Sequence, residues 1–151
     1  MAEALKEAKK AESHGEVPVG AVIVKDGVVV GRGHNAAEAR KDPTAHAEMI
    51  AIREAAETLG GWRLLGCHLF VTAEPCAMCA GAMVLARIEK VWIGAPDPKS
   101  GACGSVFNIV QEKKLNHRVE IETGLMEQEC GRVMKAFFKE RRKKNTEGIH
   151  P

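Results

Sequence analysis

The sequence predicts an α/β protein with three layers, in which helices cover both faces of a central mixed sheet of five strands. First, β-branched apolar runs alternate along the chain with segments of helical periodicity, so strands and helices follow one another. Second, Asp26-Gly27 separates two apolar runs and indicates a tight hairpin, which supplies the antiparallel pair. The three later strands are each reached through a helix and are therefore expected to be parallel.

The length and composition are those of a single globular domain, 1–151, with residues 145–151 expected to form a frayed tail. A net charge of only +2 excludes a strongly basic protein of the histone type, although local basic patches can still bind nucleic acid. An odd number of cysteines outside the metal motif and the absence of a signal peptide predict a reducing, cytoplasmic location. No apolar stretch is long enough to span a membrane, so no membrane association is expected.

Helical spacing, turn residues and capping residues predict the elements of the N-terminal half. The first strand is apolar almost throughout, which indicates burial on both faces. Asp42-Pro43-Thr44 is typical of a helix start, with a capping residue followed by proline. The expected order is a helix over 2–14, strands over 19–25 and 28–34, a polar loop over 35–41 and a helix over 42–59.

The C-terminal half begins with a short strand and a helix of small residues that starts at Pro75-Cys76. A loop rich in glycine and proline follows the next strand, and the chain ends in a long helix whose polar side is strongly basic. The expected order is a strand over 68–72, a helix over 75–86, a strand over 90–94, a loop over 95–104, a helix over 106–114, a strand over 118–122 and a helix over 125–144.

One imidazole and two thiols, from His46, Cys76 and Cys79, form a ligand set that suits zinc better than other common ions. Cys76 and Cys79 are three residues apart at a helix start, which places both sulfurs on one helix face. His46 is expected in the first turn of another helix. Two helix starts that follow strands of one sheet meet at its carboxyl edge, where α/β folds bind ligands.

Three protein ligands leave one position on zinc open for water, which indicates a catalytic site. The alternative is a closed structural site, for which Cys67, His68 or Cys103 could supply a fourth ligand. Glu48 distinguishes the two interpretations. It lies about 200° around a helix from His46, yet in a first turn it can still reach the metal-bound water and act as a general base. The alternative for Glu48 is a favourable charge at a helix N-terminus.

His46-Ala47-Glu48 together with Pro75-Cys76-Ala77-Met78-Cys79 matches the signature of zinc-dependent nucleoside deaminases. Nearly the whole chain resembles the bacterial tRNA adenosine deaminases of the cytidine/deoxycytidylate deaminase superfamily, in segments 16–21, 42–48, 74–83 and 116–120. The resemblance implies a cytidine-deaminase-like fold, one Zn²⁺ per subunit, a homodimer, and hydrolytic deamination of the wobble adenosine (position 34) in a tRNA anticodon stem-loop to inosine. In this mechanism zinc-activated hydroxide attacks C6 while Glu48 shuttles the protons.

The resemblance also implies contacts with the target base. Asn35, after the second strand, would bind the target nucleoside, although a turn-forming Asn is the ordinary alternative. Val17, Val19 and Ala73 are candidates for the walls of the base pocket or are plain core residues.

Contacts with the RNA are implied in two places. The segment Asp97-Pro98-Lys99-Ser100-Gly101-Ala102 resembles the loop that faces the anticodon, with Asp97 and Lys99 as contacts. Pro96 and Pro98 depart from the family pattern and should stiffen this loop. Phe138 and Arg142 match RNA-contact positions and lie four residues apart on one helix face, which suits stacking and phosphate contact. The alternative for these two is an apolar packing side and a solvated tail.

Two other functions remain open at this stage. One is a deaminase of small molecules such as guanine or a pyrimidine nucleotide, and the other is a zinc-stabilised RNA-binding module without catalysis. The 97–102 loop and the basic helix favour a tRNA substrate over a small molecule. Glu48 and the open zinc position favour an enzyme over a binding module.

Overall fold

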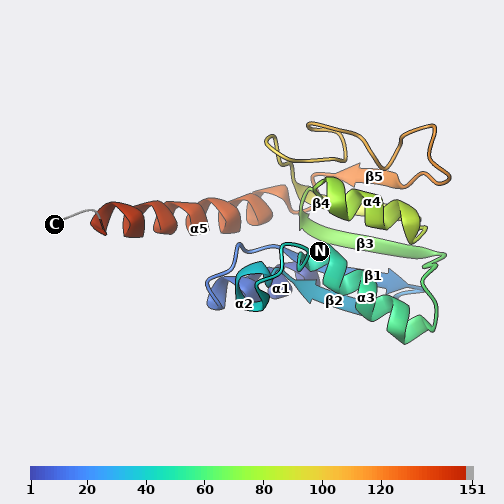
Figure 1. Cartoon of the computed structure of the whole chain (residues 1–151), viewed down its shortest axis with the longest axis horizontal. Coiled ribbons are helices and arrows are strands. Elements are labelled where there is room, and N and C mark those ends of the chain that lie inside the picture. The colour runs from blue at the N-terminus through green and yellow to red at the C-terminus, as the bar shows by residue number, and fades with distance from the viewer. Residues whose placement is uncertain (149–151) are drawn as a thin grey trace.

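The computed structural model describes residues 1–148 and shows one five-stranded sheet with helices on both faces, which confirms the predicted fold class (Figure 1). The strand order is β2-β1-β3-β4-β5. In chain order the elements are α1 (Ala2–Ser13), β1 (Gly20–Lys25), β2 (Val28–His34), α2 (Ala37–Arg40), α3 (Ala47–Leu59), β3 (Cys67–Ala73), α4 (Ala77–Leu85), β4 (Lys90–Ala95), β5 (Glu120–Thr123) and α5 (Glu127–Glu147).

The sheet is mixed in the predicted way. β1 pairs antiparallel with both β2 and β3, whereas β3, β4 and β5 run parallel to one another. The hairpin turn has positive φ at both central residues, 51° at Asp26 and 77° at Gly27, as a type I′ turn requires. The first four residues of β1 are buried, as the apolar run predicts.

The pairing register shows which helices share a face. Gly20 pairs with His34 and lies against α1, whereas Gly33, the residue before His34 in β2, lies against α3. Because successive residues of a strand point to opposite faces, α1 and α3 cover opposite sides of the sheet. α5 packs on β4 and contacts α1, and α4 contacts α3. The layers are therefore α1 and α5, the sheet, and α3 and α4.

Two glycines in β2 set the position of α3. A Cβ atom at Gly31 would overlap the carbonyl oxygen of Ala51, and one at Gly33 would overlap the carbonyl oxygen of Ala47. The absence of side chains lets the helix backbone rest directly on the strand. Since Ala47 is the first residue of α3, Gly33 fixes where this helix begins above the sheet.

The structure corrects two predictions in the N-terminal half. The predicted loop over 35–41 contains the short helix α2, because the buried carboxylate of Glu16 accepts hydrogen bonds from the N–H groups of Glu38 and Ala39. The helix predicted from residue 42 begins at Ala47 instead. Asp42 accepts hydrogen bonds from the N–H and hydroxyl of Thr44, so 42–44 form a turn ahead of the helix.

The C-terminal half also differs from the predictions in two places. Residues 106–114 form no helix, because Val106 and Ile109 donate their N–H groups back to Gly101 and Ala102. α5 begins two residues later than predicted, after Met126 in a left-handed conformation (φ 55°), and remains helical to Glu147. Residues 145–147 of the segment expected to form a frayed tail are thus part of α5, and residues 149–151 lie outside the described part of the chain.

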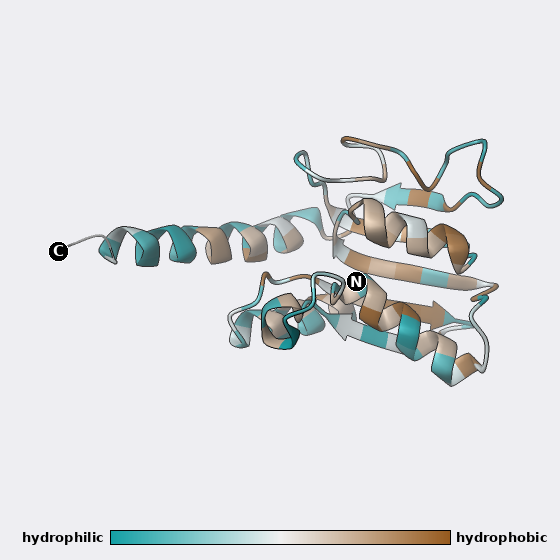
Figure 2. Ribbon diagram, viewed as in Figure 1, coloured by the Kyte–Doolittle hydropathy of each residue, from teal (hydrophilic) through white to brown (hydrophobic). Residues whose placement is uncertain are grey.

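The distribution of apolar residues follows the layers. Figure 2 shows hydrophobic residues concentrated in β1, β3 and α4, whereas the edge strand β5 and the outer turns of α5, which project beyond the sheet, are mostly hydrophilic. No helix in residues 1–148 combines the length and apolarity needed to cross a membrane.

Gly33→Ala is expected to destabilise the fold by about 1–3 kcal/mol, because the new methyl group would overlap the first peptide carbonyl of α3. Urea unfolding followed by circular dichroism measures this change in the free energy of unfolding. Gly61→Ala is the matched control, since no atom lies within 4 Å of a Cβ at that position. Equal stability of the two variants would show that α3 does not depend on contact with β2.

Candidate active site

The metal-ligand residues lie at the N-termini of two helices. His46 is the N-cap residue of α3 and Cys76 is the N-cap residue of α4, both in extended conformations, and Cys79 is the third residue of α4. The placement of His46 within the first turn is therefore corrected, because the turn at 42–44 delays the helix start. α3 and α4 come after β2 and β3 in the chain, and the starts of the two helices bring the three ligand atoms together.

The ligand atoms are spaced as a tetrahedral zinc site requires. The Sγ atoms of Cys76 and Cys79 each lie 3.6 Å from Nδ1 of His46, and all three atoms lie within 4.8 Å of one another. Zinc–sulfur and zinc–nitrogen bonds of about 2.3 Å and about 2.1 Å at tetrahedral angles give S···N separations of about 3.6 Å. Within residues 1–148 the group contains no fourth ligand, so Cys67, His68 and Cys103 do not close it. The residues therefore fit zinc and leave one position open.

The surroundings of the two thiols alter their pKa values. Hydrogen bonding with Cys79 and with His46 lowers the pKa of Cys76 to about 3 against the opposing effect of burial. The neighbouring Cys76 and burial raise the pKa of Cys79. A coordinated dication deprotonates a thiol outright, and the free N–H groups of the α4 N-terminus favour the resulting charge.

Glu48 is the second residue of α3 and is only 3% exposed. Its side chain lies within hydrogen-bonding reach of Cys79, but its oxygens are not part of the three-residue ligand group. The expected angle of about 200° from His46 does not apply, because the N-cap residue is not helical. Burial raises the pKa of Glu48, and the hydrogen bonds from its own backbone N–H and from Cys79 oppose the shift. The arrangement places a dry, non-ligating carboxylate beside the metal position.

A cavity of about 1220 Å³ opens above these residues. It brings together ten of the eleven residues predicted for the site, although they come from six separate segments. Those that line it are Val19, Asn35, His46, Glu48, Ala73, Cys76, Asp97, Lys99, Phe138 and Arg142. Cys79 is fully buried and does not line the cavity.

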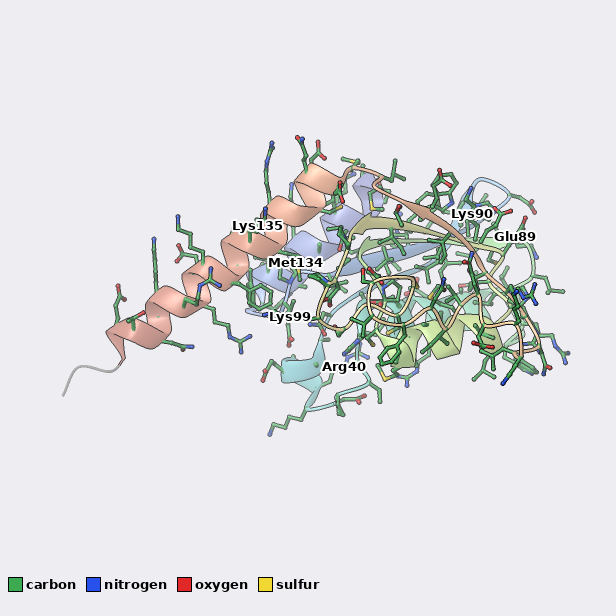
Figure 3. The ribbon with its side chains drawn as sticks, turned by 90° about the horizontal axis from the view of Figure 1, so that it is seen from above. Arg40, Glu89, Lys90, Lys99, Met134 and Lys135 are labelled. Carbon is green, nitrogen blue, oxygen red and sulfur yellow. The ribbon has the colours of Figure 1, made fainter. Side chains whose placement is uncertain are left out.

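Several of the predicted substrate contacts have other bonds in the structure. The Nδ2 group of Asn35 lies 3.4 Å from the carbonyl of Val17, and its Oδ1 accepts a hydrogen bond from the N–H of Ala37. Asp97 accepts three hydrogen bonds within its own loop, from the N–H groups of Lys99 and Ser100 and from the Ser100 hydroxyl. Asp97 therefore shapes the loop, whereas Lys99 is exposed and extends from it (Figure 3).

The sequence analysis missed two groups of cavity residues. One is a stripe on α5 that continues the line of Phe138 and Arg142 toward the helix start, and helical spacing could have identified it. Met134 and Lys135 of this stripe lie near Lys99 in Figure 3, far from Glu89 and Lys90 at the other end of the sheet. The other is Glu74, a buried carboxylate before Pro75, which belongs to the family-like segment 74–83 but to which the sequence analysis assigned no role. The remaining lining residues on α5 are Glu127, Gln128, Gly131 and Arg132.

Comparison with known proteins gives consistent relationships. The profile of the MafB19-like deaminase family matches residues 1–142. The tRNA-specific adenosine deaminase of Bacillus subtilis is 55% identical over 144 residues, which cover 95% of this chain and 89% of the relative.

Solved structures extend the relationship to the fold. A tRNA:A34 deaminase structure, from work on A-to-I editing at the wobble position of transfer RNA, superposes with a TM-score of 0.85 at 44% identity. The match covers 88% of this chain and 96% of that one. The guanine deaminase of Bacillus subtilis is more distant, with a TM-score of 0.61 and 33% identity over 93% of this chain and 90% of its own. The chain therefore belongs to the tRNA-specific adenosine deaminases, a family with the cytidine-deaminase-like fold.

Proposed function

We propose that this protein deaminates the wobble adenosine, position 34, of a tRNA anticodon to inosine by hydrolysis. The observation that carries the proposal is the open His46–Cys76–Cys79 group beside the buried, non-ligating Glu48, at the base of a wide cavity. The relatives that act on tRNA adenosine supply the substrate class. The same proposal includes a single deaminase domain over 1–151.

His46, Cys76 and Cys79 would hold one Zn²⁺ per subunit. When bound, zinc supplies a water whose pKa falls from about 15.7 to about 7. With the metal in place, Glu48 would be the group that accepts a proton from such a water and delivers it to N1 of adenine as C6 is attacked. Glu48 would then take the second proton from the new hydroxyl group on C6 and transfer it to the departing amino group, so that adenosine and water become inosine and ammonia. Its burial keeps bulk water away from the proton that it carries.

The upper part of the cavity suits a base held out of an RNA loop. Val17, Val19 and Ala73 offer apolar wall surface, and Asn35 lies at the same wall. Flipping the base out of its stack costs a few kcal/mol, which contacts with the surrounding RNA offset. The proposed contacts are Lys99 on the loop, with Asp97 shaping it, and the ring of Phe138 and the guanidinium of Arg142 on α5.

The width of the site argues against the small-molecule alternative. Pockets for small ligands enclose about 300–1,000 Å³ and bury most of the ligand surface. Here the cavity of about 1220 Å³ extends along α5 to Phe138 and Arg142, which are exposed. A free base would leave most of this surface uncovered, whereas an anticodon stem-loop would occupy it.

The same proposal includes a homodimer in the cytoplasm. α4 presents the small residues Gly81 and Ala82 and the exposed Leu85 (67%), and the connection between β4 and β5 exposes Val106 (46%) and Phe107 (58%). Apolar surface of this kind marks interaction sites, and small residues permit close helix packing.

All five cysteines are free, which suits a reducing compartment that also contains tRNA. Cell fractionation that placed the protein outside the cytoplasm would contradict this location.

Incubation with a tRNA anticodon stem-loop containing A34 is expected to raise the RNA mass by about 1 Da, as an amino group is replaced by oxygen. Mass spectrometry of nuclease fragments locates the inosine. Free adenosine, guanine, cytidine and deoxycytidylate serve as parallel substrates and should remain unchanged. Conversion of only these small compounds would support the small-molecule deaminase instead.

Glu48→Ala is expected to retain one zinc per chain and to lose at least about 100-fold in turnover, because it removes the proton carrier without touching a ligand. Glu48→Gln should behave alike, since it preserves shape but not proton transfer. Cys76→Ala should lose the metal itself, as measured by atomic emission, whereas Cys67→Ala, outside the ligand group, should retain it. Full activity of either Glu48 variant would refute the proposed mechanism.

Sedimentation equilibrium is expected to give twice the chain mass of 16.3 kDa. Leu85→Glu or Phe107→Glu should shift the protein toward the monomer, because burying an unpaired carboxylate in an apolar interface costs free energy. Val28→Glu, which adds the same charge at another exposed apolar site, is the control. A wild-type protein that sediments as a monomer at micromolar concentration would contradict the dimer.

A further inference from the structure

Glu74 has the densest set of hydrogen bonds around any carboxylate in the described chain. It is 8% exposed, and its two oxygens accept four bonds. Oε1 accepts from the N–H of Asp97 at 3.2 Å and from the hydroxyl of Ser105. Oε2 accepts from the N–H groups of Cys103 and Ser105, both at 3.1 Å. All four donors come from one segment, 97–105, although Glu74 lies more than twenty residues earlier in the chain.

The segment closes around this carboxylate. The N–H of Gly101 bonds to the carbonyl of Asp97 at 2.9 Å, and the N–H of Ala102 bonds to the carbonyl of Pro75 at 2.8 Å. A Cβ atom at Gly101 would overlap the Glu74 carboxylate, so glycine there permits the close approach. The segment is thus wrapped on Glu74 and on the backbone of the residue that follows it.

The charge of Glu74 is balanced by N–H and O–H dipoles. Among residues 1–148 no cationic side chain forms an ion pair with it. Successive backbone N–H groups can form a concave site for an anion, and here a side chain of the protein occupies it. Such bonds are directional, so the carboxylate specifies the path of the loop and does more than neutralise charge.

The part of the 97–105 segment nearest its start lines the cavity and is mostly exposed. Pro98, Lys99 and Ser100 are exposed, and Pro96 to Ser100 line the cavity. Glu74 itself is two residues from the metal-ligand residue Cys76. One short stretch, 74–76, therefore connects the RNA-facing loop to the metal position, with Pro96 and Pro98 restricting the remaining backbone freedom.

We infer that Glu74 is a positioning residue, which holds the 97–105 loop in the conformation that presents Lys99 to the RNA backbone. The inference rests on the proposed function, because it assigns the loop to RNA binding. A loop that is already ordered loses less conformational entropy on binding, so Glu74 would lower KM for the RNA and leave the chemical step unchanged.

Glu74→Gln tests this inference with little change in shape. The amide keeps one oxygen, and its NH₂ group faces two of the four donors whichever way it is oriented. KM for the anticodon stem-loop is expected to rise about tenfold or more, with kcat and zinc content unchanged within about twofold. Hydrogen exchange by mass spectrometry should show faster exchange of the amides in 97–105.

Two further variants isolate the effect. Glu7→Gln alters another buried carboxylate, which pairs with Lys10 and His34 on the α1 side of the sheet, and it should leave both KM and loop exchange unchanged. Ser105→Ala removes one of the four donors from the loop side. Its KM increase should be smaller, and it should add little to that of Glu74→Gln, because both variants release the same contact. If Glu74→Gln fails to fold, Ser105→Ala still provides the test.

The outcomes separate the possible failures. A Glu74→Gln protein that loses zinc, or that loses kcat at unchanged KM, would overturn the inference, because Glu74 would then act on the metal segment. Unchanged exchange in 97–105 would overturn it whatever the substrate is. If the wild-type protein converts no stem-loop, the proposed function is refuted, along with the RNA part of the inference. Faster exchange of the 97–105 amides in Glu74→Gln would then still show that Glu74 anchors the loop.

Discussion

The structure depends on bringing two helix N-termini close enough for three ligand atoms to lie within one coordination sphere. His46 caps α3 and Cys76 caps α4. The strands that precede these helices, β2 and β3, are not neighbours in the sheet, because β1 lies between them. The distance between these helices is set by backbone contact, because Gly31 and Gly33 let α3 rest on β2. Metal geometry tolerates errors of only about 0.2 Å, so the packing of a helix on a strand becomes a requirement of the site.

Glu48 illustrates how one local conformation serves several purposes. Because His46 is an extended cap residue, the imidazole and the carboxylate two residues later can reach the same place. In a continuous helix they would point in nearly opposite directions. The extended residue follows directly on a turn, in which the N–H of Ala45 bonds to the carbonyl of Asp42 and the N–H of His46 bonds to the carbonyl of Thr44. The geometry of the site therefore depends on a turn that does not itself line the cavity.

Local chemistry explains which features could be predicted from the sequence. The hairpin, the parallel strands and the ligand trio follow from short-range patterns, such as Asp26-Gly27 and the Cys76–Cys79 spacing. The errors occurred where distant partners decide the outcome. Glu16 makes a helix of residues 37–40, and the 101–104 backbone prevents one over 106–114. Glu74 escaped notice for the same reason, since all its partners lie beyond residue 96.

The outer half of α5 projects past the sheet, and its side chains are exposed from Phe138 onward (Figure 1). Substitutions there change no core contact, and an exposed position typically alters stability by less than about 0.5 kcal/mol. The residues of the His46–Cys76–Cys79 group have no such freedom, because they are buried or hydrogen-bonded. In the proposed role of α5 as an RNA contact, mutations in this arm can accumulate without threatening the fold, and natural selection can adjust which RNAs the protein accepts while the proposed metal site stays the same.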